Sequence, residues 1–133
     1  MYKHCDCCSS FPAPYIIDVN SMARHNTNFR AEEWTGNNMQ LTLMSIPVNK
    51  DIGVEVHEHT DQMIRIESGC AMAVMWQSCD NMCYRQELKC GDAVFIPAGT
   101  WHNIINIGRC SLKLSSVYAP PAHRRGTVQK TKD

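Results

Sequence analysis

The chain has 133 residues, with 13 basic side chains against 13 acidic ones, so its formal net charge is zero. A chain of this length forms one domain and buries a hydrophobic core without needing disulfides or a structural metal. The balanced charge gives no field that would attract nucleic acid or an anionic membrane, so neither is expected as a partner. The longest apolar run, Cys70 to Trp76, is too short to cross a membrane. Since the N-terminus does not read as a secretory signal, we expect a cytoplasmic protein.

Eight cysteines in so short a chain raise the question of disulfides or metal binding. Three of them crowd into an N-terminal tail, residues 1–14, as Cys5, Cys7 and Cys8. A zinc site built on this cluster with His4 is one alternative, but no second ligand pair lies nearby. The remaining cysteines are poorly spaced for paired metal knuckles, and we interpret them as reduced, buried small side chains. These are Cys70, Cys79, Cys83, Cys90 and Cys110.

Past the tail, the sequence consists of short strand-forming runs separated by turn residues. The expected strands are 15–19, 29–35, 40–47, 54–59, 63–67, 71–76, 84–88, 93–96, 102–106 and 112–118. A short helical turn, capped by Asn20, follows the first of them. Many short strands without a helical period predict an all-β antiparallel sandwich or barrel over residues 15–119. Residues 120–133 are polar and basic, and we expect them to leave the barrel as a C-terminal tail.

Three histidines stand out by their placement. His57 and His59 are two residues apart in an expected strand, so their imidazoles share one face. Gln62 opens the next strand and shares its inward, apolar face with Ile64. His102 follows a tight turn much later in the chain and can supply a third nitrogen. Nitrogen ligands of this kind suit zinc, iron, nickel, copper or manganese.

Two motifs around these histidines carry a family resemblance. The stretch from Gly91 to Asn106, GDAVFIPAGTWHNIIN, matches every fixed position of G-x5-P-x-G-x2-H-x3-N, the second cupin motif. The stretch from Gly53 to Gly69 resembles the first motif, G-x5-H-x-H-x3-4-E-x6-G, with shorter spacings and with Gln62 at the glutamate position. The chain thus resembles the cupin superfamily. The runs LTLMSIP, DQMIRIESG and PAGTWHNIIN are similar to small single-domain cupins labelled mannose-6-phosphate isomerase-like.

The resemblance implies a jelly-roll barrel, or double-stranded β-helix, that holds a divalent metal (Zn, Mn, Fe or Ni) through His57, His59, Gln62 and His102. The plain alternative is a set of buried histidines satisfied by hydrogen bonds. Because glutamine offers only a neutral carbonyl oxygen, such a site carries no compensating negative charge. That favours a Lewis acid over a metal that cycles between oxidation states.

Residues around the expected site bear on the substrate. Glu55 shares the face of His57 and is the nearest candidate for proton transfer, unless it is a solvated rim charge. Trp101 either lines the mouth of the pocket or belongs to the core. A sugar phosphate would need an inward Arg or Lys, whereas Arg65 and Lys113 are expected to point outward.

These observations leave three classes of function open. The first is a metal-dependent enzyme acting on a small polar substrate, such as a sugar-phosphate isomerase. The second is a binding or sensing module that holds a small molecule without converting it, and the third is a metal-dependent dioxygenase. The runs 71–76 and 102–107 are apolar on both faces. We therefore expect a second subunit to cover them, which makes the protein a homodimer.

Overall fold

The computed structural model describes residues 12–77 and 83–133. These parts of the chain form one short helix and nine strands. In chain order they are α1 (Val19–His25), β1 (Arg30–Thr35), β2 (Gln40–Ile46), β3 (Asp61–Ser68), β4 (Cys70–Trp76), β5 (Cys83–Lys89), β6 (Ala93–Ile96), β7 (Trp101–Asn106), β8 (Leu112–Ala119) and β9 (Val128–Gln129).

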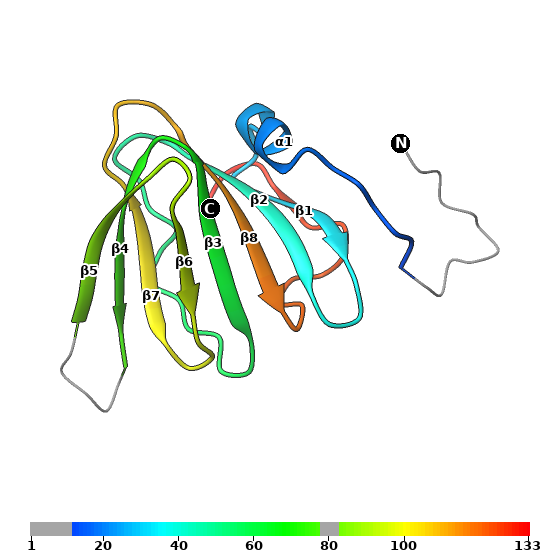
Figure 1. Ribbon diagram of the computed structural model, residues 1–133. Coiled ribbons are helices and arrows are strands. Elements are labelled where there is room, and N and C mark those ends of the chain that lie inside the picture. The colour runs from blue at the N-terminus through cyan, green and yellow to red at the C-terminus, as the bar shows by residue number, and fades with distance from the viewer. Residues whose placement is uncertain (1–11, 78–82) are drawn as a thin grey trace.

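The strands form two antiparallel sheets that face one another (Figure 1). The larger sheet has the order β6-β3-β8-β2-β1-β9, and the smaller has the order β5-β4-β7. Single bridges from Asp51 to Ile105 and from Glu55 to His102 lay the β2–β3 connection against β7. This arrangement confirms the expected all-β barrel with a short helix near the N-terminus.

Alternation along the strands builds the core between the sheets. On β3, Gln62, Ile64 and Ile66 are all buried, whereas Asp61 and Arg65 are exposed. The predicted inward face of this strand is therefore confirmed. Together, the inward side chains of both sheets form one hydrophobic cluster, which includes Met44, Ile46, Ile64, Ile66, Ala71, Ala73, Val94, Ile104, Leu112 and Leu114. Burial of this cluster supplies the main driving force for folding.

The expected strand at 15–19 is wrong. Residues 15–18 form no strand, and helix α1 begins at Val19. Asp18 caps the helix, since its side chain accepts a hydrogen bond of 3.1 Å from the backbone N–H of Ser21. Asn20, expected as the cap, instead donates to the carboxylate of Glu67 at 2.9 Å. The helix packs on the outer face of the larger sheet, against β2, β3 and β8, and Asn20 ties it to that buried carboxylate.

The expected strand at 54–59 is also wrong. Gly53 has a φ of 91°, outside the extended region, and Glu58 and His59 form a turn. Only Glu55 pairs with a neighbouring strand, through its bridge to His102. The backbone therefore bends on both sides of this bridge, and His57 and His59 do not share the face of a regular strand.

The C-terminal segment does not leave the barrel. Strand β9 pairs with β1 at the edge of the larger sheet. Before it, the backbone N–H of His123 donates to the buried side chain of Gln40 at 2.9 Å. After it, the ammonium of Lys132 lies 2.6 Å from a carboxylate oxygen of Asp51. Polar side chains on the barrel thus hold the whole segment against its surface.

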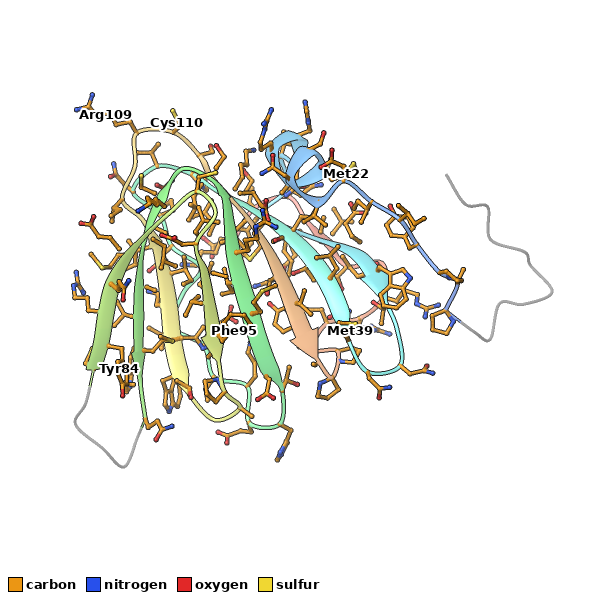
Figure 2. The ribbon with its side chains drawn as sticks, viewed as in Figure 1. Met22, Met39, Tyr84, Phe95, Arg109 and Cys110 are labelled. Atoms are coloured by element: carbon orange, nitrogen blue, oxygen red, sulfur yellow. The ribbon has the colours of Figure 1, made fainter. Side chains whose placement is uncertain are left out.

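The prediction of buried cysteines is wrong for those that the structure describes. Cys70, Cys83, Cys90 and Cys110 are free and exposed, because they lie at strand ends, in turns and in the β7–β8 loop. Cys110 is the one labelled in Figure 2. The predicted cluster of His4, Cys5, Cys7 and Cys8, together with Cys79, falls outside the described residues.

Apolar side chains remain on the outer surfaces of both sheets. Phe95 on β6 is 73% exposed, and Met39 before β2 is 47% exposed (Figure 2). On the smaller sheet, Trp76 stacks on Trp101 with ring centroids 6.5 Å apart. A second subunit could cover these surfaces, but the structure contains a single chain, so the homodimer stays a prediction. Within the described residues, no helix is long and apolar enough to span a membrane.

Candidate metal centre

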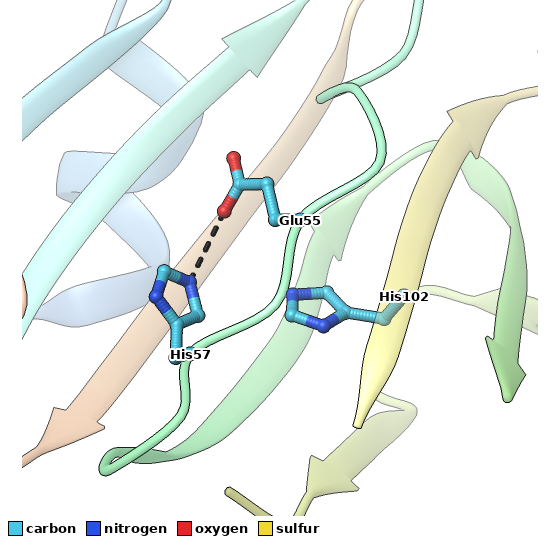
Figure 3. Close-up of side chains that lie close together, drawn as sticks. All are labelled: Glu55, His57 and His102. Atoms are coloured by element: carbon cyan, nitrogen blue, oxygen red, sulfur yellow. Dashed lines mark hydrogen bonds and ion pairs between the residues drawn. The ribbon is translucent and has the colours of Figure 1, made fainter. Parts of the chain in front are cut away.

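Glu55, His57 and His102 come together between the two sheets (Figure 3). One potential ligand atom from each lies within 4.8 Å of the other two. Nε2 of His57 and Oε2 of Glu55 lie 3.1 Å apart in a direct hydrogen bond. Two of the residues come from the β2–β3 connection and the third from β7, so the group depends on the bridge between these segments.

Backbone hydrogen bonds fix this group. The N–H of Glu55 donates to the carbonyl of His102 at 2.9 Å, and the N–H of His102 donates back to Glu55 at 2.9 Å. The carbonyl of His57 accepts from Gly99 at 2.8 Å, which ties the same connection to the turn before β7. Irregular backbone therefore holds Glu55 and His57 as firmly as a strand would.

His102 is fully buried, and its tautomer follows from its surroundings. Its Nδ1 lies 3.0 Å from the carbonyl oxygen of Thr100, which can only accept, so Nδ1 carries the hydrogen. Burial lowers the pKa of this imidazole, although the bond to Thr100 and the charge of Glu55 oppose the shift. Nε2 consequently presents a lone pair, and within the described residues this atom has no hydrogen-bond partner. A buried acceptor without a partner is the state of a histidine prepared for a metal.

Glu55 carries the negative charge of the group. Its Oε1 lies 3.3 Å from the guanidinium of Arg30, opposite the contact with His57. Burial alone would raise the pKa of Glu55. The hydrogen bond from His57 and the charge of Arg30 outweigh burial and lower it. The carboxylate is therefore ionised at neutral pH.

Arg30 is a site residue that sequence reasoning missed. It is 7% exposed, and it points inward from the start of β1. Its guanidinium also donates to the side chain of Gln129 on β9 at 2.7 Å, while its Nε has no partner among the described residues. The predicted strand 29–35 has no regular alternation, so its inward positions could not be assigned. The barrel does contain the inward cation that an anionic substrate requires.

Gln62 lies inside the barrel, as predicted. Its amide nitrogen donates to the hydroxyl of Ser116 at 2.9 Å, while Oε1 is buried without a partner in the described chain. The hydrogen bond to Ser116 fixes the amide. A free carbonyl oxygen at this position is a donor that a divalent ion accepts.

Two other predicted site residues lie elsewhere. His59 is exposed in the turn that follows His57, and the structure does not bring it into the group. Trp101 stacks on Trp76. It neighbours His102 in β7, but alternation sends the two side chains to opposite faces.

A second layer of aromatic side chains surrounds His57. The phenol ring of Tyr118 packs edge-on against this imidazole, with centroids 5.5 Å apart. Its hydroxyl lies 3.3 Å from Nε2 of His123, which comes from the C-terminal segment. Burial is the main reason that the pKa of His123 falls to about 4, so this imidazole is neutral at pH 7. Sequence reasoning missed His123 because the C-terminal segment was expected to leave the barrel. It placed Tyr118 in an expected strand but assigned it no role in the site.

The residues present fit a divalent ion. Two imidazoles and a carboxylate form a donor set that suits zinc, iron, manganese or nickel. Ligand atoms about 2.1 Å from one ion lie at most about 4.2 Å apart, so the group has to contract only slightly. The unpartnered Nε2 of His102 is the atom that such an ion would satisfy.

The fold and this group define the class of protein. Residues 42–118 match the model of the cupin domain, and the chain belongs to the cupin family. It is 44% identical over 121 residues to the uncharacterized protein YrkC of Bacillus subtilis, covering 91% of this chain and 65% of that protein. The chain thus spans just under two thirds of the length of that relative.

Solved structures give the same result. The crystal structure of BH2720 from Bacillus halodurans superimposes with a TM-score of 0.88 and 45% sequence identity. That match covers 91% of this chain and 92% of the other. The structure of TT1209 from Thermus thermophilus is more distant, with a TM-score of 0.65 and 25% identity over 79% of this chain and 96% of the other.

Proposed function

We propose that the protein is a metal-dependent enzyme that acts on a small, polar, anionic substrate inside the barrel. The observation that carries this proposal is the group of Glu55, His57 and His102, whose potential ligand atoms lie within 4.8 Å of one another. The buried, unpartnered Nε2 of His102 supports it, since leaving a polar atom unsatisfied costs stability that a purely structural site would avoid.

The proposed ligands are His57 and His102, with an oxygen from Gln62 or Glu55. His59, also predicted as a ligand, is exposed and would have to swing inward with its turn. A bound divalent ion would polarise a substrate oxygen or lower the pKa of a coordinated water. The hydrogen bond to Thr100 holds His102 in the tautomer that can coordinate.

Arg30 and Glu55 give the site its selectivity and its proton chemistry. The guanidinium is buried and its Nε–H has no partner among the described residues, so it can orient the carboxylate or phosphate of a substrate. If the Gln62 oxygen completes the ligand set, the ionised Glu55 is free to accept a proton from the substrate. This combination matches the demands of a sugar-phosphate isomerase, the activity in the label mannose-6-phosphate isomerase-like.

The carboxylate also favours a second candidate, a metal-dependent dioxygenase. Two histidines and one carboxylate with open positions form the ligand set of non-heme iron oxygenases. Sequence reasoning placed no carboxylate among the ligands and so favoured Lewis-acid chemistry. If Glu55 coordinates the metal, the ligand set carries a negative charge, so the argument against redox chemistry no longer applies. Iron then becomes the expected metal.

One set of variants separates these roles. Metal content is measured by elemental analysis on untagged protein and on Glu55→Gln, with Glu58→Gln, an exposed neighbour, as the matched control. Turnover is then measured on sugar phosphates under nitrogen and on small carboxylates under oxygen.

For the isomerase, Glu55→Gln keeps its metal but loses at least 100-fold in turnover, whereas for the dioxygenase it loses the metal. No turnover of any substrate by metal-loaded protein would favour the binding or sensing module instead. Equal metal content in His102→Ala and the unmodified protein would refute the site.

A further inference from the structure

A separate pocket lies at the far end of the larger sheet. Its volume is ≈ 570 Å³, within the range that holds small molecules. The end of β2, the start of β8 and the C-terminal segment line it, including Ser45, Lys113 and Lys132. Tyr118, which packs against His57, lies five residues further along β8 than Lys113, or roughly 17 Å. None of the candidate metal ligands lines this pocket.

Four lysines converge on the pocket from separate segments. Lys50 comes from the β2–β3 connection, Lys113 from β8, and Lys130 and Lys132 from the C-terminal segment. Because the whole chain has zero net charge, this concentration of positive charge is local. Of the four, only Lys132 forms an ion pair within the described residues, with Asp51. Asp133 also lines the pocket and offsets part of this positive charge.

Lys113 is held in place by two hydrogen bonds within this cluster of lysines. Its ammonium donates to the backbone carbonyl of Asn26 at 2.5 Å and to the hydroxyl of Ser45 at 3.0 Å. Both acceptors are neutral, and in the part of the chain that the structure describes they leave one of the three N–H donors unused. Burial lowers the pKa of Lys113. A partly buried cation without a counter-ion is costly, and a bound anion would supply the missing charge.

The remaining lining indicates the kind of anion. Thr27, Ser45 and Ser111, which carry hydroxyl donors, line the same pocket as the lysines. Thr131 lines it too, although its hydroxyl donates to the carbonyl of Asp133 at 2.8 Å. Lysines act as strong point charges toward phosphate, whereas a single carboxylate would use fewer donors. The volume exceeds that of a bare phosphate ion, and Phe29 and Pro47 supply an apolar wall.

We propose that this pocket binds a small organic phosphate at a site independent of the barrel. The three lysines that form no ion pair within residues 12–77 and 83–133 hold the phosphate, and the apolar wall accommodates the organic part. The site is distinct from that of the proposed function, because the two share no residue.

Isothermal titration calorimetry with the full chain at 50 mM and 150 mM KCl tests this proposal. The probes are AMP, inorganic phosphate and adenosine, which separate the phosphate from the organic part. AMP is expected to bind with one site per chain, more tightly than phosphate and more weakly at higher salt, while adenosine alone does not bind.

Lys113→Met is expected to weaken AMP binding at least tenfold. Lys130→Gln, on an exposed side chain, should weaken it three- to tenfold and serves as the second test if Lys113→Met fails to fold. Lys89→Gln removes the same charge from exposed β5 and should change the affinity less than twofold, as should His102→Ala.

The proposal is overturned if AMP shows no saturable binding, or if Lys89→Gln weakens it as much as Lys130→Gln does. An equal loss in His102→Ala would move the binding into the barrel. That result would refute the second site while leaving the proposed function intact.

Discussion

The two halves of the barrel interior differ in character although the same strands build both. On β8, Leu112 and Leu114 occupy the inward positions of one half, and Ser116 and Tyr118 those of the other. The same change runs along the neighbouring strands, where β2 goes from Ile46 to Gln40, β3 from Ile66 to Gln62, and β7 from Ile104 to His102. One half is an apolar core, and the other is a buried polar site.

Most of the unpartnered polar atoms lie in the polar half. Of the six buried side-chain atoms without a partner within the described residues, four belong to it, namely Nε of Arg30, Oγ1 of Thr42, Oε1 of Gln62 and Nε2 of His102. The other two are Oγ1 of Thr100, before β7, and Oδ1 of Asn103 on β7. Natural proteins keep few such atoms, because each costs stability. We infer that the apolar half stabilises the fold, while the polar half keeps polar groups that are available to bind a ligand.

Removing bulk from the apolar half gives the largest expected effect on stability. Ile66→Ala deletes a fully buried side chain and should lower the free energy of unfolding by about 2–5 kcal/mol, measured by urea denaturation. Its metal content should stay unchanged. A loss of stability below about 1 kcal/mol would contradict the stabilising role of the apolar half. Loss of the metal as well would show that the two halves are not independent.

Acid should destabilise the protein through the polar half. The pKa of His123 is about 4 in the folded protein and about 6.5 when unfolded, so the unfolded chain binds more protons between these values. Stability is full above pH 6.5 and falls as the pH drops toward 4. The loss is up to about 3 kcal/mol, since each pKa unit is worth about 1.4 kcal/mol. His123→Asn should remove this part of the pH dependence in unfolding measured from pH 7 to 4; an unchanged profile would contradict it.

Gln62→Leu should have a small effect on stability despite its burial. The variant loses one hydrogen bond to Ser116 but also removes the unpartnered Oε1, so the free energy of unfolding should change by less than about 1 kcal/mol. Thermal unfolding of the metal-free protein measures this. A loss comparable to that of Ile66→Ala would show that Gln62 is structural and would remove the contrast between the halves.

His59→Ala should have the smallest effect. The imidazole is exposed in the turn after His57, so metal affinity should change less than threefold. His57→Ala, two residues away, should reduce the affinity at least 100-fold. Competition with a chromophoric chelator measures both variants. Equal losses would restore His59 to the ligand set that the sequence predicts.

The fold followed from sequence largely because its strands alternate. The inward face of β3 and the burial of Gln62 and His102 could be predicted from parity and from the turn at Pro97–Gly99. The β2–β3 connection could not, because the positive φ of Gly53 and the turn at His59 interrupt the strand pattern. The two-residue spacing of Glu55 and His57 still predicted that their side chains lie together, because the bridge from Glu55 to His102 keeps the backbone locally extended.

Arg30 and His123 could not be predicted because long-range pairing places them. Arg30 is fixed by Gln129, 99 residues away in sequence, and His123 by Tyr118 and Gln40 on the barrel. Neither residue lies in a motif, and the composition of the C-terminal segment suggested a solvated tail. Only the fold brings these side chains to the polar half.

Cobalt(II) titration of metal-free protein tests the central claim, that the polar half holds one divalent ion, most directly. The visible absorbance of the bound ion should saturate at one equivalent per chain. It should also persist when Cys5, Cys7 and Cys8 are replaced by serine. In His102→Ala the signal should disappear, whereas in His59→Ala it should remain. An unchanged signal in His102→Ala, or none in the unmodified protein, would contradict the claim.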